Sequence, residues 1–284
     1  MVTGKTKTSG PLIDSSFKKE NFNQYHLCLE IAQDHISACV FDTVQDVVIL
    51  AERRPLERTF VIEDLEAFLK HAHFLEEYEA VSYCWKGFPS VLVPIGLFDP
   101  EEAKNYFNLS HGYIPNQLDL IDANSCGVKI VAESIAKVDS LLQTRFPNAL
   151  KNNNTALLLD QIQRKNRFVK TPQLFIEVDE TNSEFFLFQG AELLYHNNFD
   201  VSAAEDVLYF LANIAEQYKL RLEDLNVFVA GYWQVNGAEV KLLGKYIKNV
   251  QVNMGYEYVK LGLGMSGLRK QQFASLFNQY SCVS

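Results

Sequence analysis

Two stretches of the chain share one pattern of apolar and polar positions: an apolar run, a short polar tip and a second apolar run. They are LCLEIAQDHISACVF at 27–41 and LFIEVDETNSEFFLF at 174–188. A shift of 147 residues, from 27 to 174, aligns them and places Glu30 on Glu177. The pattern is typical of a β-hairpin. The chain is therefore predicted to contain an internal repeat that opens each half.

Each predicted hairpin is followed by a third apolar stretch and then by a helix. The third strands are DVVILAERR at 46–54 and AELLYHNNF at 191–199. In the second half, apolar residues at helical spacing predict a helix within 200–219. Ser202 and Glu205 have the spacing of the S-x-x-E capping box that begins such a helix.

The second half continues with a strand at 225–231, a helix within 237–248, a strand within 249–261 and a last helix within 268–280. Its order therefore reads βββαβαβα. The first half copies the beginning of this order, with a helix within 61–78 and a strand at 79–85. Three antiparallel strands followed by strands entered through helices make a mixed sheet with helices on both faces.

The region between the two halves does not copy this pattern and is interpreted as an insertion into the first lobe. The polar runs KNNN at 151–154 and KNRFVKTP at 165–172 favour loops at the lobe boundary. The predicted domains are a flexible N-terminal tail at 1–20, a first lobe at 21–170 with an inserted segment at about 110–165, and a second lobe at 171–284.

The charge balance limits the classes of partner. The 26 basic and 35 acidic residues give a net charge of −9, which repels phosphate backbones and anionic bilayers. No apolar run approaches the roughly 20 residues that span a bilayer, so neither nucleic acid nor a membrane span is expected. The N-terminus has no apolar segment of a secretory signal. The five widely spaced cysteines indicate reduced thiols and hence a cytoplasmic protein.

Two tandem βββαβα lobes resemble the actin-like ATPase superfamily, which includes sugar kinases, heat-shock chaperones and pilus-assembly proteins. The resemblance implies an α/β fold of two ribonuclease H-like lobes with mixed sheets. At a finer level the chain looks like a bacterial family of uncharacterised proteins with that fold. The strings that carry this likeness are HLCLEIAQDHISACVFD at 26–42, VLVPIGLFDPEEAKNYF at 91–107 and LFIEVDETNSEFFLFQGAELLYHNNF at 174–199.

The resemblance implies that a nucleotide would bind between the lobes, at the two hairpin tips. Active superfamily members carry Asp-x-Gly there, because a glycine lets backbone N–H groups approach phosphate. In the second tip Asp179 is kept but Thr181 stands at the glycine position. The first tip, 32–34, is Ala-Gln-Asp and has neither residue. Asp34 would place negative charge where phosphate should lie.

The adenosine motif of the superfamily presents two small glycines after a strand. Here the corresponding residues are Ala230 and Gly231, followed by the bulky Tyr232. On this resemblance the candidates for nucleotide binding are Asp179, Thr181, Gly231 and Tyr232. No catalytic residue is assigned, and ATP with magnesium is not expected to be turned over.

Other motifs favour structural roles. GLGMSG at 262–267 fits a dinucleotide loop, but only 17 residues follow it, so a glycine-hinged turn is preferred. A helix N-terminus there would still accept an anion. His71 and His73, two residues apart on the predicted helix, should point in different directions as surface histidines, and no metal site is predicted.

Glu30 and Glu177 occupy equivalent strand positions, which predicts the same structural role in each lobe, such as an outward position. The leading functional hypothesis is a pseudoenzyme of actin-like ATPase fold that serves as a binding or assembly partner of another protein. One alternative is an active ATPase or small-molecule kinase that uses Asp179. Another is a switch that senses nucleotide without hydrolysing it.

Overall fold

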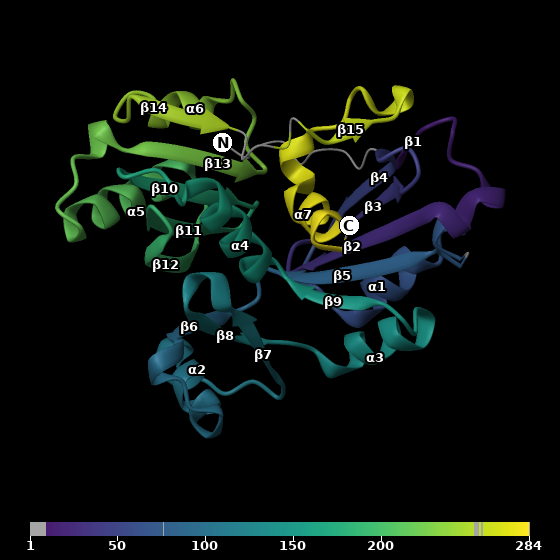
Figure 1. Ribbon diagram of the computed structural model, residues 1–284, viewed down its shortest axis with the longest axis horizontal. Helices are drawn as coiled ribbons and strands as arrows, with labels where there is room; N and C mark the ends of the chain where they lie inside the picture. The colour runs from purple at the N-terminus through teal and green to yellow at the C-terminus, as the bar shows by residue number, and fades with distance from the viewer. Residues whose placement is uncertain (1–9, 76, 253–255, 257, 284) are drawn as a thin grey trace.

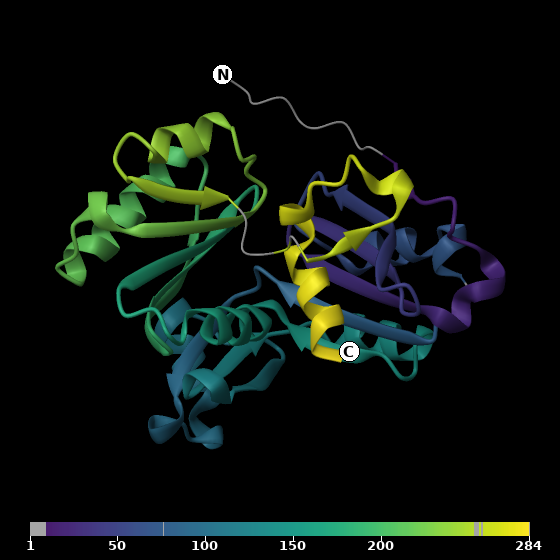
Figure 2. The same cartoon turned by 45° about the horizontal axis from the view of Figure 1, so that its top comes forward.

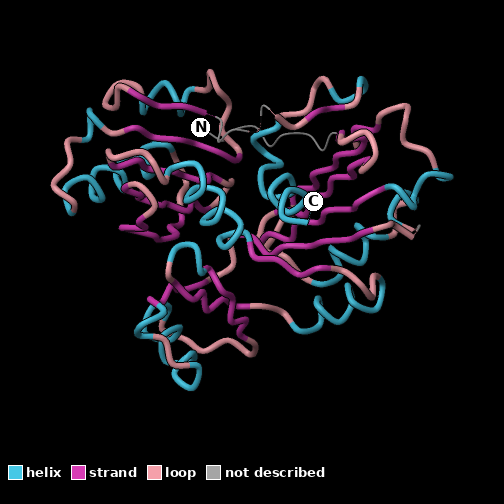
Figure 3. The backbone as a smooth tube through the Cα atoms, in the orientation of Figure 1, coloured by secondary structure: helices cyan, strands magenta, loops and turns pink. Residues whose placement is uncertain are grey.

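The apolar runs of both halves form strands that collect into three sheets (Figure 1). The computed structural model describes residues 10–75, 77–252, 256 and 258–283. Within these residues, no helix combines the length and apolar character that a membrane crossing needs. Figure 3 shows the strands of the two larger sheets on either side of the molecule, with the small third sheet below them.

The first lobe is built on a seven-stranded sheet in the order β1-β4-β3-β2-β5-β9, with β15 beside β4. Strands β2, β3 and β4 are antiparallel neighbours, and β5 and β9 run parallel to the strands they join. The strands are β1 Leu12–Ile13, β2 Tyr25–Ala32, β3 His35–Asp42, β4 Val47–Pro55, β5 Ala80–Lys86, β9 Leu150–Asn153 and β15 Lys260–Leu261.

The second lobe is built on a five-stranded sheet in the order β12-β11-β10-β13-β14. The first three strands are antiparallel and the last two join in parallel, which confirms the predicted mixed sheet. In the two hairpins, Glu30 lies opposite Ser37 and Glu177 lies opposite Glu184. The strands are β10 Pro172–Val178, β11 Asn182–Gln189, β12 Glu192–Asp200, β13 Asn226–Gly231 and β14 Asn249–Val252.

The inserted subdomain is a three-stranded antiparallel sheet of order β6-β8-β7, covered by helix α2. Its elements are β6 Ser90–Pro94, α2 Ala103–His111, β7 Leu118–Ala123 and β8 Val128–Glu133. The predicted insertion at 110–165 was therefore placed too late in the chain. Its end was wrong because β9 pairs with β5 in the sheet of the first lobe.

The remaining α-helices pack on the two larger sheets. They are α1 Ile62–Leu69, α3 Ala136–Arg145, α4 Asn154–Asn166, α5 Ala204–Gln217, α6 Ala238–Leu243 and α7 Ala274–Val283. Short 3₁₀ helices connect the elements: η1 Lys19–Gln24, η2 Ala72–Phe74, η3 Ile95–Leu97, η4 Pro100–Glu102, η5 Asn124–Cys126, η6 Leu222–Asp224, η7 Leu263–Met265 and η8 Lys270–Phe273. Helices α1 and α3 share an apolar core with the first sheet, and α5 and α6 share one with the second.

Helices α4 and α7 lie between the two lobes and pack against each other (Figures 1 and 2). Helix α7 also contacts β2 and β5, and α4 contacts β5 and β11. One apolar core joins α4, α7 and both large sheets, with Cys39 from the first sheet, Phe186 from the second and Phe277 from α7. Its continuity means that the lobes share a buried interior as well as a chain connection.

The C-terminal segment belongs to the first lobe, although the sequence placed all of 171–284 in the second. Strand β15 adds to β4, and α7 covers the face of the first sheet that presents Cys28 and Phe41. Burial of the apolar residues Leu276 and Phe277 against this face favours the arrangement.

Three local predictions also change. Residues 10–20 of the predicted tail are ordered by β1, which pairs with β4, while 1–9 lie outside the described residues. The run 151–154 is β9 and the start of α4, where Asn153 Oδ1 accepts from the N–H of Ala156. Helix α5 has its N-cap one residue later than predicted, at Ala203 instead of Ser202. The carboxylate of Asp206, and not that of Glu205, therefore accepts from the N–H of the N-cap residue.

Candidate functional site

Buried charged side chains of both lobes gather beside the tip of the second hairpin. Glu30 comes from β2, Arg53 from β4, Lys86 from the end of β5, and Glu177 and Asp179 from the end of β10 and the residue after it. We refer to these five residues as the interlobe ion cluster. The local fold sets the position of Asp179, because its N–H donates to the carbonyl of Asn182 and closes the hairpin turn at 2.9 Å.

Lys86 is the centre of the interlobe ion cluster. Its Nζ lies 3.2 Å from Oε1 of Glu177 and 3.2 Å from Oδ1 of Asp179, both in the second lobe. It lies 3.8 Å from Oε2 of Glu30 in its own lobe. The Lys86 side chain is 3% exposed, so these interactions are little screened by water. One buried ammonium therefore joins carboxylates of both lobes.

Arg53 provides a second cation in the cluster. Its guanidinium lies 3.9 Å from Oε1 of Glu30 and 3.7 Å from Oδ1 of Asp179. Three carboxylates thus face two permanent cations, and this pairing is the condition under which buried charges are tolerated. Arg53 and Lys86 were both missed at the sequence level. The available signal was a basic residue next to or ending an apolar strand, in VILAERR and AVSYCWK.

His35 and Ser275 satisfy the remaining oxygen atoms of Glu30. His35 Nε2 lies 2.6 Å from Oε1 of Glu30, and its Nδ1 lies 2.5 Å from Oδ1 of Asp34. The hydroxyl of Ser275 donates to Oε2 of Glu30. The carboxylate of Asp34, predicted to oppose phosphate, is therefore paired with the imidazole beside it. Glu30 and Glu177 are buried, which corrects the expectation of outward positions.

The cluster shifts the pKa values of its members in opposite directions. Burial raises the pKa of Glu177 to about 7, with Lys86 opposing and the Asp179 carboxylate reinforcing this shift. Burial also raises the pKa of Glu30, but Lys86, His35 and Arg53 together outweigh it and hold that pKa below its usual range. Burial lowers the pKa of Lys86, and the three carboxylates outweigh this effect and keep the amine protonated.

Helix α4 approaches the cluster with its N-terminus. The amide of Asn154 donates to Oε2 of Glu177 at 2.5 Å, and the hydroxyl of Thr155 donates to Oε1 of Glu184 at 2.6 Å. His196 Nε2 lies 2.7 Å from the same oxygen of Glu184. The positive end of the helix dipole favours carboxylates at this place. His196 therefore contributes to the network beside the cluster.

The four predicted nucleotide-binding residues are only partly brought together. Asp179 lies in the interlobe ion cluster, whereas Thr181 is exposed at the tip, where its carbonyl accepts from Val201 N–H at 2.9 Å. Gly231 has a φ of +94°, and an added Cβ would lie 2.1 Å from the carbonyl oxygen of Val178. Tyr232 donates its N–H to that oxygen at 2.7 Å and packs on the core of the second lobe. Gly231 and Tyr232 thus secure β13 to β10.

The glycine motif at 262–267 packs on the carboxylate of Asp14. The N–H of Gly264 donates to Oδ2 of Asp14 at 2.6 Å. A Cβ on Gly262 would lie 2.6 Å from Cγ of Asp14, so the missing side chain makes room for this carboxylate. The hydroxyl of Ser16 and the N–H of Gly264 lower the pKa of Asp14. The motif is a turn that ties the C-terminal segment to β1.

Two surface hollows of the described structure lie away from the interlobe ion cluster. One of about 270 Å³ lies between α4 and α7 and is lined by Leu157, Gln161, Arg164, Lys165, Tyr258, Asn278 and Ser281. The other, of about 510 Å³, is lined by Arg167, Phe168, Val169, Lys170, Gln189 and Gly190. Neither is lined by a predicted nucleotide-binding residue.

The family of the chain follows from a match over most of its length. A family model described as protein of unknown function (DUF3822) matches residues 14–250. The chain belongs to this family. No curated protein matches it. The predicted resemblance to a family of uncharacterised proteins is thereby confirmed.

Solved structures identify the fold of this DUF3822 member. It is similar to a Bacteroides thetaiotaomicron VPI-5482 protein described as having an actin-like ATPase fold and unknown function. The two share 17% sequence identity and a TM-score of 0.73, and the match covers 94% of this chain and 100% of that chain. It is also similar to the PilM–PilN type IV pilus biogenesis complex, with 12% identity, 89% and 96% coverage, and a TM-score of 0.57. The chain has an actin-like ATPase fold, as predicted.

Proposed function

We propose that this DUF3822 protein is a binding or assembly protein that uses an actin-like fold and hydrolyses little or no ATP. The observation that carries the proposal is the position of Lys86, whose ammonium is paired with Glu177 and Asp179 across the lobes. In this fold the hairpin tips are where a nucleotide would bind. An internal cation already neutralises the one Asp that the second tip retains.

The altered hairpin tips support the same proposal. Thr181 replaces the glycine that would let the backbone approach phosphate, and the first tip carries Asp34, a carboxylate paired with His35. Magnesium-bound triphosphate would have to displace Lys86 and Arg53 from buried carboxylates. The metal would have to replace these cations as the partner of the buried carboxylates, so the pairing already present competes with its binding. The degenerate motifs and the closed cluster therefore both oppose turnover.

A protein partner is supported by the inserted subdomain. Six of the sixteen large apolar side chains that are exposed in the described residues lie within 95–120, and they are Ile95, Leu97, Leu109, Tyr113, Ile114 and Leu120. Exposed apolar side chains concentrated in one small region are typical of an interaction surface. The similarity to PilM, which forms a complex with PilN, agrees with a role of the fold in assembly.

The decisive experiment is isothermal titration with ATP and magnesium, run on the wild type and on Asp179→Ala, together with an assay of phosphate release. We expect no binding up to about millimolar nucleotide, an affinity of about −4 kcal/mol. Magnesium-dependent hydrolysis that Asp179→Ala abolishes would overturn the proposal in favour of an ATPase or kinase. Binding without phosphate release would favour a nucleotide-sensing switch.

The partner surface is tested separately with a photo-crosslinking amino acid at Leu109, which is 89% exposed. The matched control places the same group at Glu216, an exposed position on α5. We expect a specific crosslinked product in cells from position 109 and none from position 216. Equal crosslinking at both positions would argue against a docking surface on the inserted subdomain.

A further inference from the structure

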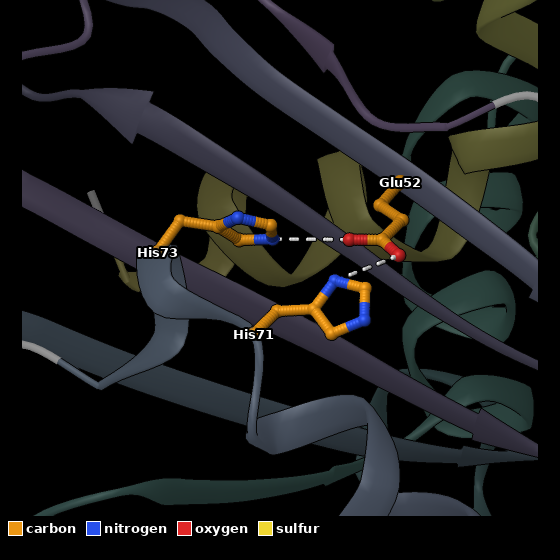
Figure 4. Close-up of side chains that lie close together, drawn as sticks. All are labelled: Glu52, His71 and His73. Atoms are coloured by element: carbon orange, nitrogen blue, oxygen red, sulfur yellow. Dashed lines mark hydrogen bonds and ion pairs between the residues drawn. The ribbon is translucent and has the colours of Figure 1, made fainter.

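Three side chains of the first lobe that do not belong to the interlobe ion cluster converge in space (Figure 4). Glu52 lies in β4, and His71 and His73 lie between α1 and the end of η2. Nδ1 of His71 is 3.6 Å from Oε1 of Glu52, and Nε2 of His73 is 3.0 Å from Oε2. One donor atom from each residue lies within 4.8 Å of the others.

This convergence corrects the expectation that the two histidines point apart. The expectation assumed a continuous helix, but α1 ends at Leu69 and His71 has extended backbone angles of −62° and 140°. The change of direction brings both imidazoles over β4, with ring planes at 87° to each other. Because neighbouring residues of β4 point to opposite faces of the sheet, Glu52 faces the histidines while Arg53 faces the other lobe.

The spacing of the donor atoms suits a small divalent ion. Zinc binds nitrogen and oxygen ligands at about 2.0–2.2 Å in a tetrahedron, so neighbouring ligand atoms are separated by about 3.3–3.6 Å. His73 Nε2 lies 3.0 Å from Oε2 of Glu52, and His71 Nδ1 lies 3.6 Å from Oε1. The three donor atoms lie within 4.8 Å of one another, so a side-chain adjustment is needed to bring all of them onto one ion. Two imidazoles and one carboxylate are a donor set that transition ions such as zinc prefer over magnesium or calcium.

We propose that Glu52, His71 and His73 form a binding site for a divalent transition ion of the zinc class. The three side chains provide three ligands and leave the fourth position to water. The side chains of Glu52 and His73 are only 5% and 12% exposed, so the surrounding residues hold these two ligands in place. The side chain of His71 is 38% exposed, so an ion can reach the site from solvent on that side.

Arg54 competes with the ion for the same atoms. Its guanidinium donates to Oε1 of Glu52 at 3.2 Å and lies 2.5 Å from Nε2 of His71, over the ring of Phe68. A His71 that accepts a hydrogen bond at Nε2 carries its proton on Nδ1, the atom needed for the metal. Metal binding therefore requires Arg54 to withdraw, which its 25% exposed side chain permits.

The bound ion would attach the segment after α1 to strand β4. Because the ligands are brought together by folding, an ion that binds the folded protein should stabilise it against unfolding. Arg54 provides part of this attachment when no ion is present. Metal binding would thus replace the guanidinium of Arg54 with the metal ion as the cation beside Glu52.

The test uses the full chain without an affinity tag of histidines, stripped of metal with a chelator. Zinc binding is measured by titration calorimetry, and cobalt is used as a spectroscopic probe because a four-coordinate site gives visible absorption bands. We expect one ion per chain. His71→Ala and Glu52→Gln should each weaken zinc binding at least about tenfold, since even residues that merely support metal ligands are worth about 10–100-fold.

Two further variants distinguish a metal site from adventitious binding. Arg54→Gln should tighten zinc binding, because it removes the competing charge. His111→Gln changes an exposed histidine of the inserted subdomain and should leave binding unchanged. His71→Ala also controls for folding, because its native residue is the most exposed ligand. Its thermal unfolding without zinc should lie close to that of the wild type, and zinc should raise the unfolding temperature of the wild type but not that of His71→Ala.

The proposal is overturned if the wild type binds neither zinc nor cobalt. It is also overturned if Glu52→Gln and His71→Ala bind them as tightly as His111→Gln.

Discussion

Lys86 of the first lobe and Asp179 of the second lobe form a buried ion pair, with 3.2 Å between Nζ and Oδ1. The same ammonium is 3.2 Å from Glu177, so one side chain connects the first sheet to the second hairpin. The relationship gives the region between the lobes a structural role that does not depend on nucleotide.

Replacing Lys86 with methionine should strongly destabilise the protein. The change keeps a long apolar side chain but leaves Glu177 and Asp179 without their nearest cation. Removing one partner of a buried ion pair costs about 3–5 kcal/mol, which denaturant unfolding followed by circular dichroism would measure. Adding Asp179→Asn should recover part of this loss, because the second change removes an unpaired charge.

The matched control for Lys86→Met is Lys129→Met. Lys129 pairs with Asp122 at 2.5 Å on the surface of the inserted subdomain, and such exposed pairs contribute about 0–1 kcal/mol. If both lysine variants lose the same small amount, the interlobe ion cluster does not stabilise the fold as described.

The contribution of Glu177 to the unfolding free energy should decrease as the pH rises from about 5 to 8. Glu177 has an ordinary pKa of 4.5 and a folded pKa of about 7. Its stabilising contribution is therefore complete below pH 4.5 and is lost as the pH rises through 7. The raised pKa of His35 acts in the same direction above 6.5. Burial lowers the pKa of His26 to about 4, so His26 acts in the opposite direction below about pH 6.5. The lowered pKa of Glu30 contributes nothing in this range, since that carboxylate is ionised in both states.

Glu177→Gln should flatten this pH dependence, removing up to about 3 kcal/mol of the change in unfolding free energy between the two ends of the range. Urea titrations at a series of pH values would measure it. Glu216→Gln changes the charge equally at an exposed position and should leave the slope intact. A Glu177→Gln protein with the slope of the wild type would show that the Glu177 carboxyl is not protonated by burial.

Gly231→Ala should disrupt the junction between β13 and β10. The new Cβ would lie 2.1 Å from the Val178 carbonyl oxygen, at a φ of +94°. Gly112→Ala provides the comparison, since its φ is +75° but no atom lies within 4 Å of the new Cβ. Backbone strain alone costs about 1–3 kcal/mol. Thermal unfolding should show a clearly larger loss for Gly231→Ala, and equal losses would contradict the close approach.

Phe277→Ala should destabilise the protein by about 3–5 kcal/mol, the usual cost of emptying a buried aromatic site. The ring is fully buried in the core that α7 shares with both lobes. Phe168→Ala, at a ring that is 80% exposed, should change the unfolding free energy by less than about 1 kcal/mol. A small loss at Phe277 would show that α7 is not needed to join the lobes.

The sequence by itself determined the local elements and, through their order, the fold. The alternation within 27–41 and 174–188 specifies strands and tips because side chains of a strand point alternately to two faces. The same reasoning correctly placed α5 and the βββα order of the second lobe. It also placed Asp179 at a hairpin tip, because a polar residue that ends an apolar strand must leave the sheet there.

Tertiary structure alone decided which distant residues meet. Lys86 and Asp179 are separated along the chain by the inserted subdomain and by α3, β9, α4 and β10, and no local pattern relates them. The packing of α7 on the first lobe depends on which sheet face is left uncovered after the other helices have packed. Glu52 meets His71 because α1 ends early. The spacing of apolar residues predicts which face of its own helix or strand a residue occupies. Contacts between distant residues depend instead on how whole helices and strands pack together.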